Sequence, residues 1–158
     1  MASITTVDDV LVDSVDFAVY LNRKANEKNL NVNVTKIQKW LYICYGIYLA
    51  IYEKQLLNEK PKVWEYGPVF EKVHTKQIES NGNLDNYYSS VDHGYLKKFD
   101  GLIDETLKHF GSWTSEELFS WTHEEGKAWD KRKTANGMRK SMDNLNIMAD
   151  FKELLPDE

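Results

Sequence analysis

The longest apolar stretch of the chain runs from Trp40 to Tyr52 and is interrupted only by Gly46. No charged side chain occurs within these thirteen residues, so a helix here would be apolar on all its sides. Such a helix normally lies at the buried centre of a bundle. We therefore predict a central helix that opens at Thr35, where Thr35 and Gln38 have the spacing of a capping box.

Apolar residues recur with helical spacing on both sides of this stretch. Thr6 and Asp9 are a capping pair for a first helix, and Thr114 and Glu117 form a second capping box. Helices are expected over about residues 7–28, 35–52, 69–79, 95–110, 114–123 and 138–154. The predicted fold class is mostly α, a compact single-domain helical bundle of about six helices around the central apolar helix.

The segment between residues 56 and 69 breaks the helical pattern. Val63–Tyr66 has the composition of a short strand. Gly67 permits a tight turn, and we expect Pro68 to occupy the first turn of the next helix. Residues 83–92 are expected to form a loop, with an edge strand at Tyr87 and Tyr88 as the alternative. The fold therefore contains at most one small β-hairpin.

The 158 residues include no repeat, low-complexity tract or linker, which predicts one domain. A net charge of −5 and a pI near 5.4 argue against nucleic acid or an anionic membrane as partner. Basic residues gather at Lys131, Arg132 and Lys133, where a solvated helix face is the ordinary interpretation. The longest apolar run is too short to cross a bilayer, and the N-terminus lacks a secretion signal. We expect a cytoplasmic protein.

One segment has residues typical of acid–base or metal chemistry, namely His123 followed by Glu124 and Glu125. A zinc-peptidase helix needs a second histidine four residues later, and position 127 is a lysine. We therefore expect His123 to form hydrogen bonds within the fold, and Cys44 to be a buried, inert thiol. No catalytic residue, metal site or cofactor is predicted. A hydrolase or metal enzyme centred on His123 and Glu124 is the less favoured alternative.

Four segments, in order and at sensible spacing, resemble motifs of one family, the SocA-like antitoxin or Panacea domain. Asp16–Leu21 is similar to its opening helix, and Thr35–Tyr42 to its T-x-K-L-Q-K-L-L-Y-Y segment. Trp64–Val69 resembles its W-x-x-G-P-V turn, and Leu118–Trp129 its L-T-H-x-x-x-x-W segment. The resemblance assigns structural roles to Thr35, Lys36, Gln38, Lys39, Tyr42, Trp64, Gly67, Pro68, Thr122, His123 and Trp129.

The resemblance implies an antitoxin-type module of bacteria, prophages and mobile elements over residues 14–158. Residues 1–13 would be an N-terminal extension or the start of the first helix. Such domains neutralise toxins encoded nearby by direct binding, and one member delivers its toxin to a protease as an adaptor. The family is not known for a cofactor or a reaction. The expected partner is therefore a protein, a nearby toxin, with a host protease as a further partner.

Binding energy at protein interfaces concentrates in aromatic and charged anchors. We expect the partner-binding residues to be Trp64, Tyr66, Phe70, His74, Trp113, Trp129, Lys131 and Arg132, with Tyr87, Tyr88 and Lys133 as further candidates. Lys131, Arg132 and Lys133 are expected to form a rim that speeds association with an acidic partner. The chain departs from the family just after Val69 and just before Trp129, two places where the family often has proline. These departures are expected to tune partner choice. The alternatives are a phage- or mobile-element-encoded inhibitor or adaptor acting on a host protein, and a nucleic-acid regulator, which the charge disfavours.

Overall fold

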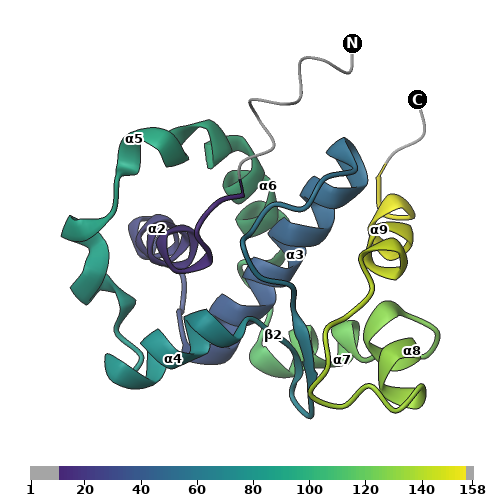
Figure 1. Cartoon of the computed structure of the whole chain (residues 1–158). Helices are drawn as coiled ribbons and strands as arrows, with labels where there is room; N and C mark the ends of the chain where they lie inside the picture. The colour runs from purple at the N-terminus through teal and green to yellow at the C-terminus, as the bar shows by residue number, and fades with distance from the viewer. Residues whose placement is uncertain (1–10, 156–158) are drawn as a thin grey trace.

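The computed structural model describes residues 11–155, and in these residues it confirms the mostly α fold class with one small antiparallel hairpin (Figure 1). The elements are α2 (Ser14–Glu27), α3 (Val34–Tyr52), β1 (Lys62–Trp64), β2 (Gly67–Val69), α4 (Glu71–Glu79), η2 (Leu84–Ser90), α5 (His93–Leu96), η3 (Lys97–Phe99), α6 (Asp100–Phe110), α7 (Ser115–Thr122), α8 (Ala128–Thr134) and α9 (Asn144–Lys152). Within residues 11–155, no helix is both long and apolar enough to cross a membrane.

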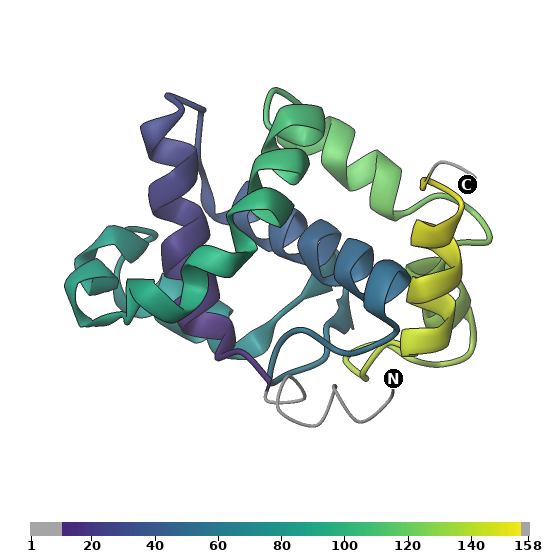
Figure 2. The same ribbon diagram turned by 90° about the horizontal axis from the view of Figure 1, so that it is seen from above.

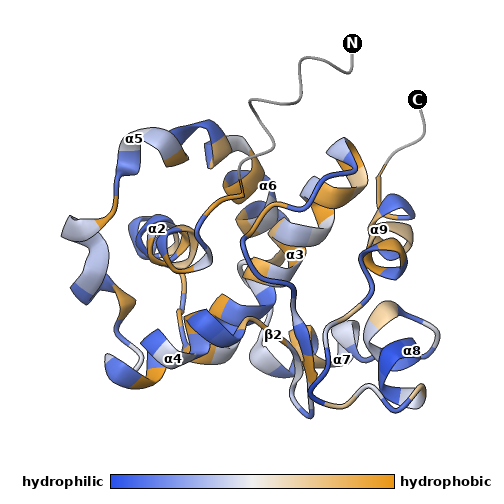
Figure 3. Ribbon diagram, in the orientation of Figure 1, coloured by the Kyte–Doolittle hydropathy of each residue, from blue (hydrophilic) through white to orange (hydrophobic). Residues whose placement is uncertain are grey.

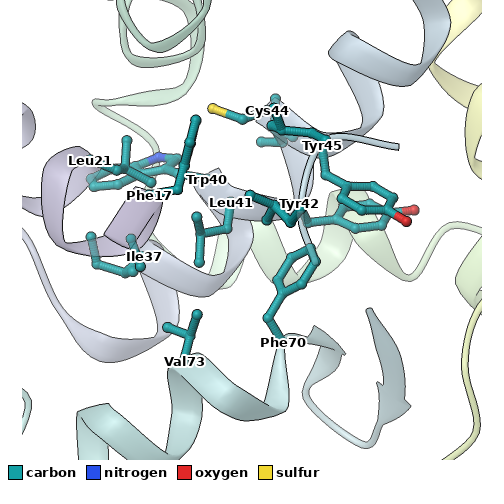
Figure 4. Close-up of a cluster of buried hydrophobic side chains, with 14 of the residues drawn as sticks. Phe17, Leu21, Ile37, Trp40, Leu41, Tyr42, Cys44, Tyr45, Phe70 and Val73 are labelled. Carbon is teal, nitrogen blue, oxygen red and sulfur yellow. The ribbon is translucent and has the colours of Figure 1, made fainter. Parts of the chain in front are cut away.

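Helix α3 is the spine of the fold, as its all-round apolar sequence predicts. Helices α2, α6, α7 and α9 pack around it, and the view from above shows it running through the middle of the molecule (Figure 2). The side chains of Trp40, Leu41 and Tyr45 have no exposed surface. They belong to one continuous cluster that reaches Phe17 on α2 and Phe70 before α4 (Figure 4). Coloured by hydropathy, α3 is among the most apolar helices (Figure 3).

The predicted cap of α3 is wrong. Asn33 caps the helix, because its side-chain oxygen accepts a hydrogen bond from the Lys36 amide at 2.8 Å. Thr35 therefore lies inside the helix. Gln38 does not reach back to the helix start, since its side chain is bound to the backbone of Phe70. The Gln38 side chain is therefore engaged in a tertiary contact and is not available for the predicted capping box.

The first helix begins later than predicted. It starts at Ser14, where the Asp13 carboxylate accepts a hydrogen bond from the Asp16 amide at 2.9 Å. The predicted capping pair, Thr6 and Asp9, lies outside the described residues. The second predicted capping box is confirmed: the Thr114 hydroxyl accepts from the Glu117 amide, and the Glu117 carboxylate accepts from the Thr114 amide.

Several other expectations are wrong. Pro68 lies in strand β2 and not in the first turn of α4, and Tyr87 and Tyr88 lie in the 3-10 helix η2 and not in a strand. The predicted helix over 95–110 is broken by η3. The last predicted helix begins only at Asn144, and the sequence pattern missed α8. Positive φ angles at Asn136 and Arg139 exclude a helix from this segment, which pairs with β1 instead.

Helix α9 lies directly against α3 because Gly46 carries no side chain. A β-carbon at Gly46 would overlap the ring of Phe151, which is fully buried. The same ring packs edge-on against Tyr42 and Trp121, with centroid distances of 5.5 Å in both cases. Phe151 thereby fixes the C-terminal helix to the spine and to α7.

We expect Gly46→Ala to lower the free energy of unfolding by about 2 kcal/mol, because overpacking a filled core forces side chains and backbone to move. Gly101→Ala is the matched control, since Gly101 is also helical and an added β-carbon would meet no atom within 4 Å. Alanine is the better helix former, so this variant is expected to gain up to about 1 kcal/mol. Urea unfolding measures both variants, and equal effects would contradict the close approach of α9.

Candidate functional site

The residues of the three clearest sequence motifs meet around the turn of the β-hairpin. The ribbon shows α7 and α8 beside this hairpin (Figure 1). We call this site the hairpin corner and define it as the turn Trp64–Gly67 together with Lys39, His123 and Trp129. Lys39 comes from α3, His123 ends α7 and Trp129 lies in α8. Residues that are far apart in the sequence therefore support one short turn.

The turn itself is tight and presents an aromatic side chain. Trp64 pairs with Gly67, so that only Glu65 and Tyr66 form the loop between the strands. Gly67 has a φ of +116°, which side-chain-bearing residues rarely adopt. The side chain of Tyr66 is 63% exposed, one of the largest exposures of any apolar side chain in the described part of the chain.

Two side chains hold the turn from one side through its carbonyl groups. The indole N–H of Trp129 donates to the Trp64 carbonyl at 3.0 Å. The His123 ring lies between two carbonyls, with Nε2 at 3.1 Å from the Glu65 oxygen and Nδ1 at 2.7 Å from the Phe119 oxygen. A neutral imidazole donates to only one of these oxygens, whereas an imidazolium donates to both.

His123 is also packed between two aromatic rings. Its ring stacks on Phe119 with a centroid distance of 3.8 Å and lies against Trp129 at 3.9 Å. Phe119 is 42% exposed. The histidine therefore joins α7, α8 and the turn. The expectation that His123 forms hydrogen bonds within the fold is confirmed.

Lys39 supports the turn from beneath and is the least usual residue of the corner. Only 1% of its surface is exposed, and no carboxylate in residues 11–155 pairs with it. Burial lowers the pKa of the Lys39 ammonium to about 8, because a low-dielectric surrounding disfavours the charged form. A β-carbon on Gly67 would lie 2.9 Å from Lys39 Cε and 3.2 Å from His123 Cε1. Glycine is therefore needed at position 67 for space as well as for backbone conformation.

Gln38 fixes the other end of the hairpin. Its side-chain oxygen accepts from the Phe70 amide at 2.8 Å, and its NH2 group donates to the Phe70 carbonyl at 3.2 Å. The same NH2 group contacts Gln77 Oε1 at 3.2 Å. A buried amide that meets both backbone groups of one residue leaves little freedom at the β2–α4 junction.

Trp64 is half-buried at the side of the turn. Its indole N–H donates to Glu71 Oε2 at 3.2 Å, and the Arg139 guanidinium lies 4.3 Å from its ring centroid. His74 meets the ring edge-on at 4.8 Å. Lys62 pairs with Glu71 at 2.9 Å, and this hydrogen bond lowers the pKa of the Glu71 carboxyl. The ion pair with Lys62 therefore keeps the Glu71 carboxylate in position to accept the hydrogen bond from the Trp64 indole.

The structure separates the predicted partner-binding residues into groups. Tyr66 is exposed at the turn, with Trp64 and His74 half-buried beside it. The prediction is wrong for Phe70 and Trp129, because Phe70 is fully buried in the core and only 5% of Trp129 is exposed. Both are core supports of the corner and not contact residues.

The remaining candidates lie elsewhere on the molecule. Trp113 is half-buried, away from the turn, in a hollow with Trp121. Tyr87 and Tyr88 lie in η2 beside α2, and the Arg23 guanidinium covers the Tyr88 ring at 3.6 Å. Lys131, Arg132 and Lys133 are on the last turn of α8.

Besides Gln38 and Pro68, four of the residues to which the resemblance gives structural roles lie outside the corner itself. Lys36 is buried and its ammonium donates to the Asn31 carbonyl at 2.9 Å, which closes the turn before α3. The Thr122 hydroxyl donates to the Phe119 carbonyl at 3.0 Å. Tyr42 is buried against Phe151, and Thr35 lies half-buried in the first turn of α3.

Sequence reasoning missed two residues of this surface. Phe119 lies inside the quoted Leu118–Trp129 segment, and its spacing of four residues from His123 on a helix could have revealed the contact. Arg139 could not have been found, because its position over Trp64 depends on the pairing of residues 138–141 with β1.

His123 and Glu124 are not brought together for chemistry. No hydrogen bond joins them in the described residues; Glu124 pairs with Lys127 at 3.2 Å and lines the hollow beside Trp121. No group of three or more potential metal ligands occurs between residues 11 and 155. Cys44 is buried against the Thr106 hydroxyl, and burial raises the pKa of its thiol to about 12. A thiol in that state is a weak nucleophile.

The model of one protein family, described as "Antitoxin SocA-like, Panacea domain", matches residues 37–130. The match covers more than half of the chain and includes Lys39, the hairpin turn, His123 and Trp129. It ends before Lys131. No curated protein and no solved structure matches the chain.

Proposed function

The chain belongs to the SocA-like Panacea antitoxin family, and on this premise we propose that it is a non-enzymatic antitoxin that neutralises a toxin by binding it directly through the hairpin corner. The family supports a protein partner in general. The identity of the contact surface is our proposal, and it rests on the geometry of the corner.

The observation that carries the proposal is the convergence of Lys39, His123 and Trp129 on one turn. Buried or half-buried side chains bind two successive carbonyls of this turn and fill the space under Gly67. The turn they hold exposes Tyr66. A rigid aromatic anchor loses little conformational entropy on binding, and aromatic anchors dominate interface energies.

Neighbouring groups suit a protein contact. Phe119 adds exposed apolar surface through its stack on His123, and Arg139 adds a cation above Trp64. Aromatic residues and arginine are the types enriched in interfaces. Tyr66 and Phe119 would form the apolar centre, with Arg139 at the rim.

Co-expression with the adjacent reading frame tests the proposal. That frame is expressed alone and together with this protein, and growth is scored. We expect arrest by the frame alone, rescue by this protein and a complex that co-purifies. A constant toxin level during rescue indicates sequestration, whereas a falling level indicates delivery to a protease. A frame that does not impair growth, or rescue without a complex, would reject direct neutralisation.

A further inference from the structure

A group of six cations lies beside the hairpin corner in an acidic protein. We call this surface the basic face; it consists of Lys60, Lys131, Arg132, Lys133, Arg139 and Lys140. Between Lys127 and Lys140 the chain has six basic residues and one acidic residue, whereas the whole chain has 20 basic and 25 acidic residues. The positive charge is therefore concentrated in one short segment.

None of the six cations of the basic face forms an ion pair with a carboxylate within residues 11–155. Some basic side chains elsewhere pair with carboxylates, for example Arg23 with Asp85 at 3.3 Å and Lys24 with Asp100 at 3.5 Å, whereas scattered lysines such as Lys97, Lys98 and Lys108 have no ion-pair partner among the described residues. Lys133 and Arg139 lie over aromatic rings, and only longer-range attraction links Arg139 to Glu71 and Lys131 to Asp150.

The nearby carboxylates are engaged with other groups. Asp130 accepts from the Gly126 amide at 3.0 Å, Asp143 from the Leu145 amide at 2.8 Å, and Asp150 from the Ala128 amide at 2.7 Å. Two of these bonds fix the starts of α8 and α9. These carboxylates keep their charge, but each is oriented toward a backbone amide, and none forms an ion pair with a cation of the basic face within the described residues.

Part of the basic face lines a depression, and part of it is hydrogen-bonded to strand β1 of the hairpin. Lys60, Lys131 and Arg132 line a shallow depression of about 670 Å³, whose remaining wall includes Ser141, Asn146 and one carboxylate, Asp143. Arg132 Nε donates to the Ser141 carbonyl at 2.9 Å, which orients the guanidinium in advance. Residues 138–141 are hydrogen-bonded to β1, since the Val63 amide donates to the Lys140 carbonyl at 3.0 Å. Arg139 of the basic face lies over the ring of Trp64, where the turn that carries Tyr66 begins, so the basic face adjoins the hairpin corner.

We propose that the basic face binds an acidic segment of the protein partner, a stretch rich in Asp and Glu that lies beside the anchor at Tyr66. This inference rests on the proposed function and names the chemistry of the partner. Complementary charge raises the association rate and selects among partners. The depression also offers Ser and Asn side chains, which can hydrogen-bond carboxylates.

A protein segment fits the face better than nucleic acid does. A nucleic acid is a long polyanion, and beyond the six cations it would meet the acidic remainder of a chain with a net charge of −5. The tryptophans next to the face are also unavailable for base stacking, because Trp129 is buried and Arg139 covers Trp64. A short acidic peptide segment avoids both difficulties.

The test uses two triple variants of the full chain that change the charge equally. Lys60→Glu, Lys131→Glu and Lys133→Glu remove the basic face, and Lys97→Glu, Lys98→Glu and Lys108→Glu are the control. All six lysines are exposed, and none has an ion-pair partner in the described residues. Each set contains one lysine over an aromatic ring, Lys133 over Trp129 at 5.6 Å and Lys98 over Phe99 at 5.4 Å. The corresponding Gln variants replace the Glu variants if either fails to fold.

The probe is a fluorescein-labelled decaglutamate peptide, followed by fluorescence anisotropy in 50 mM and 200 mM salt. We expect binding by the wild type that weakens with salt, at least about tenfold weaker binding by the basic-face variant, and a change below about threefold in the control. Equal losses in both variants, or no binding by the wild type, would overturn the proposal. So would tighter binding of a decathymidylate than of the peptide. The toxin takes no part in this assay, so its outcome is separate from that of the co-expression experiment.

Discussion

Replacing Lys39 by methionine is expected to raise the free energy of unfolding at pH 7 by about 3 kcal/mol. The lysine is 99% buried by surface area, with 1% exposed, and no carboxylate in the described residues compensates its charge. Burial lowers its pKa from 10.5 to about 8, and each pKa unit corresponds to about 1.4 kcal/mol of differential stability. Methionine has a similar length and keeps the buried stem without the charge.

The effect has a defined pH dependence. Below pH 8 the lysine is protonated in the folded and the unfolded chain, so that the full burial penalty applies. Between about pH 8 and 10.5 the folded chain has lost the proton that the unfolded chain still binds, and wild-type stability rises relative to Lys39→Met. Above that range the lysine is neutral in both states, and the advantage of methionine is gone.

Urea unfolding of both proteins at intervals from pH 6 to pH 10.5 measures this difference. Comparison with Lys39→Met cancels the contributions of other titrating groups. A stability difference that stays constant with pH, or a methionine variant that is less stable at pH 7, would show that the ammonium is compensated in the fold.

Tyr66→Ala is expected to weaken toxin binding at least about 30-fold, which corresponds to the 2 kcal/mol typical of an interface hot spot. The side chain is 63% exposed and makes no hydrogen bond within the described residues, so its loss is expected to change the stability by less than about 0.5 kcal/mol. Loss of binding with unchanged folding therefore identifies a contact residue.

Tyr52→Ala is the matched control. Tyr52 is the same residue type, is 58% exposed and lies at the far end of α3 from the corner (Figure 1). Calorimetric titration of the toxin with both variants is the measurement, with growth rescue as the functional readout. Equal affinities for Tyr66→Ala and wild type would remove the hairpin turn from the interface, and a loss in Tyr52→Ala would point to the opposite end of the molecule.

The sequence identified the elements whose patterns are local and strong. The apolar run of α3 predicted a buried spine, and the Thr114–Glu117 spacing predicted a capping box that the structure contains. Both depend on residues within a few positions of one another. Helical periodicity and capping are properties of single segments, and a single sequence displays them.

The incorrect predictions concern residues whose environment is set by tertiary contacts. Gln38 has capping-box spacing, but a backbone 32 residues away binds its amide. Phe70 and Trp129 are aromatic residues of the type that anchors interfaces. In the structure, however, Phe70 is buried in the core, and Trp129 is buried and donates a hydrogen bond to the Trp64 carbonyl. Residues 138–143 carry helical spacing, yet they form a turn that is hydrogen-bonded to β1 and to Pro61. Burial and long-range pairing depend on the whole fold, which propensity does not describe.

The hairpin corner was visible in the sequence only as separate motifs. Each motif gave a residue type, such as the lysine, the glycine and the histidine, but not their meeting under one turn. The unpaired state of Lys39 and the free cations of the basic face are spatial properties. They depend on which side chains the fold places next to each cation, and sequence spacing does not report this.

Hydrogen–deuterium exchange of the toxin complex tests the central claim most directly, because it maps the contact surface without altering a residue. Exchange is compared in the free protein and in the complex for peptides that cover Lys62–Phe70, residues 128–141 and the C-terminal end of α3. We predict at least about tenfold slower exchange over Lys62–Phe70 in the complex, with little change around Tyr52. Unchanged exchange at the turn, with protection confined to the far end of α3, would contradict binding through the hairpin corner.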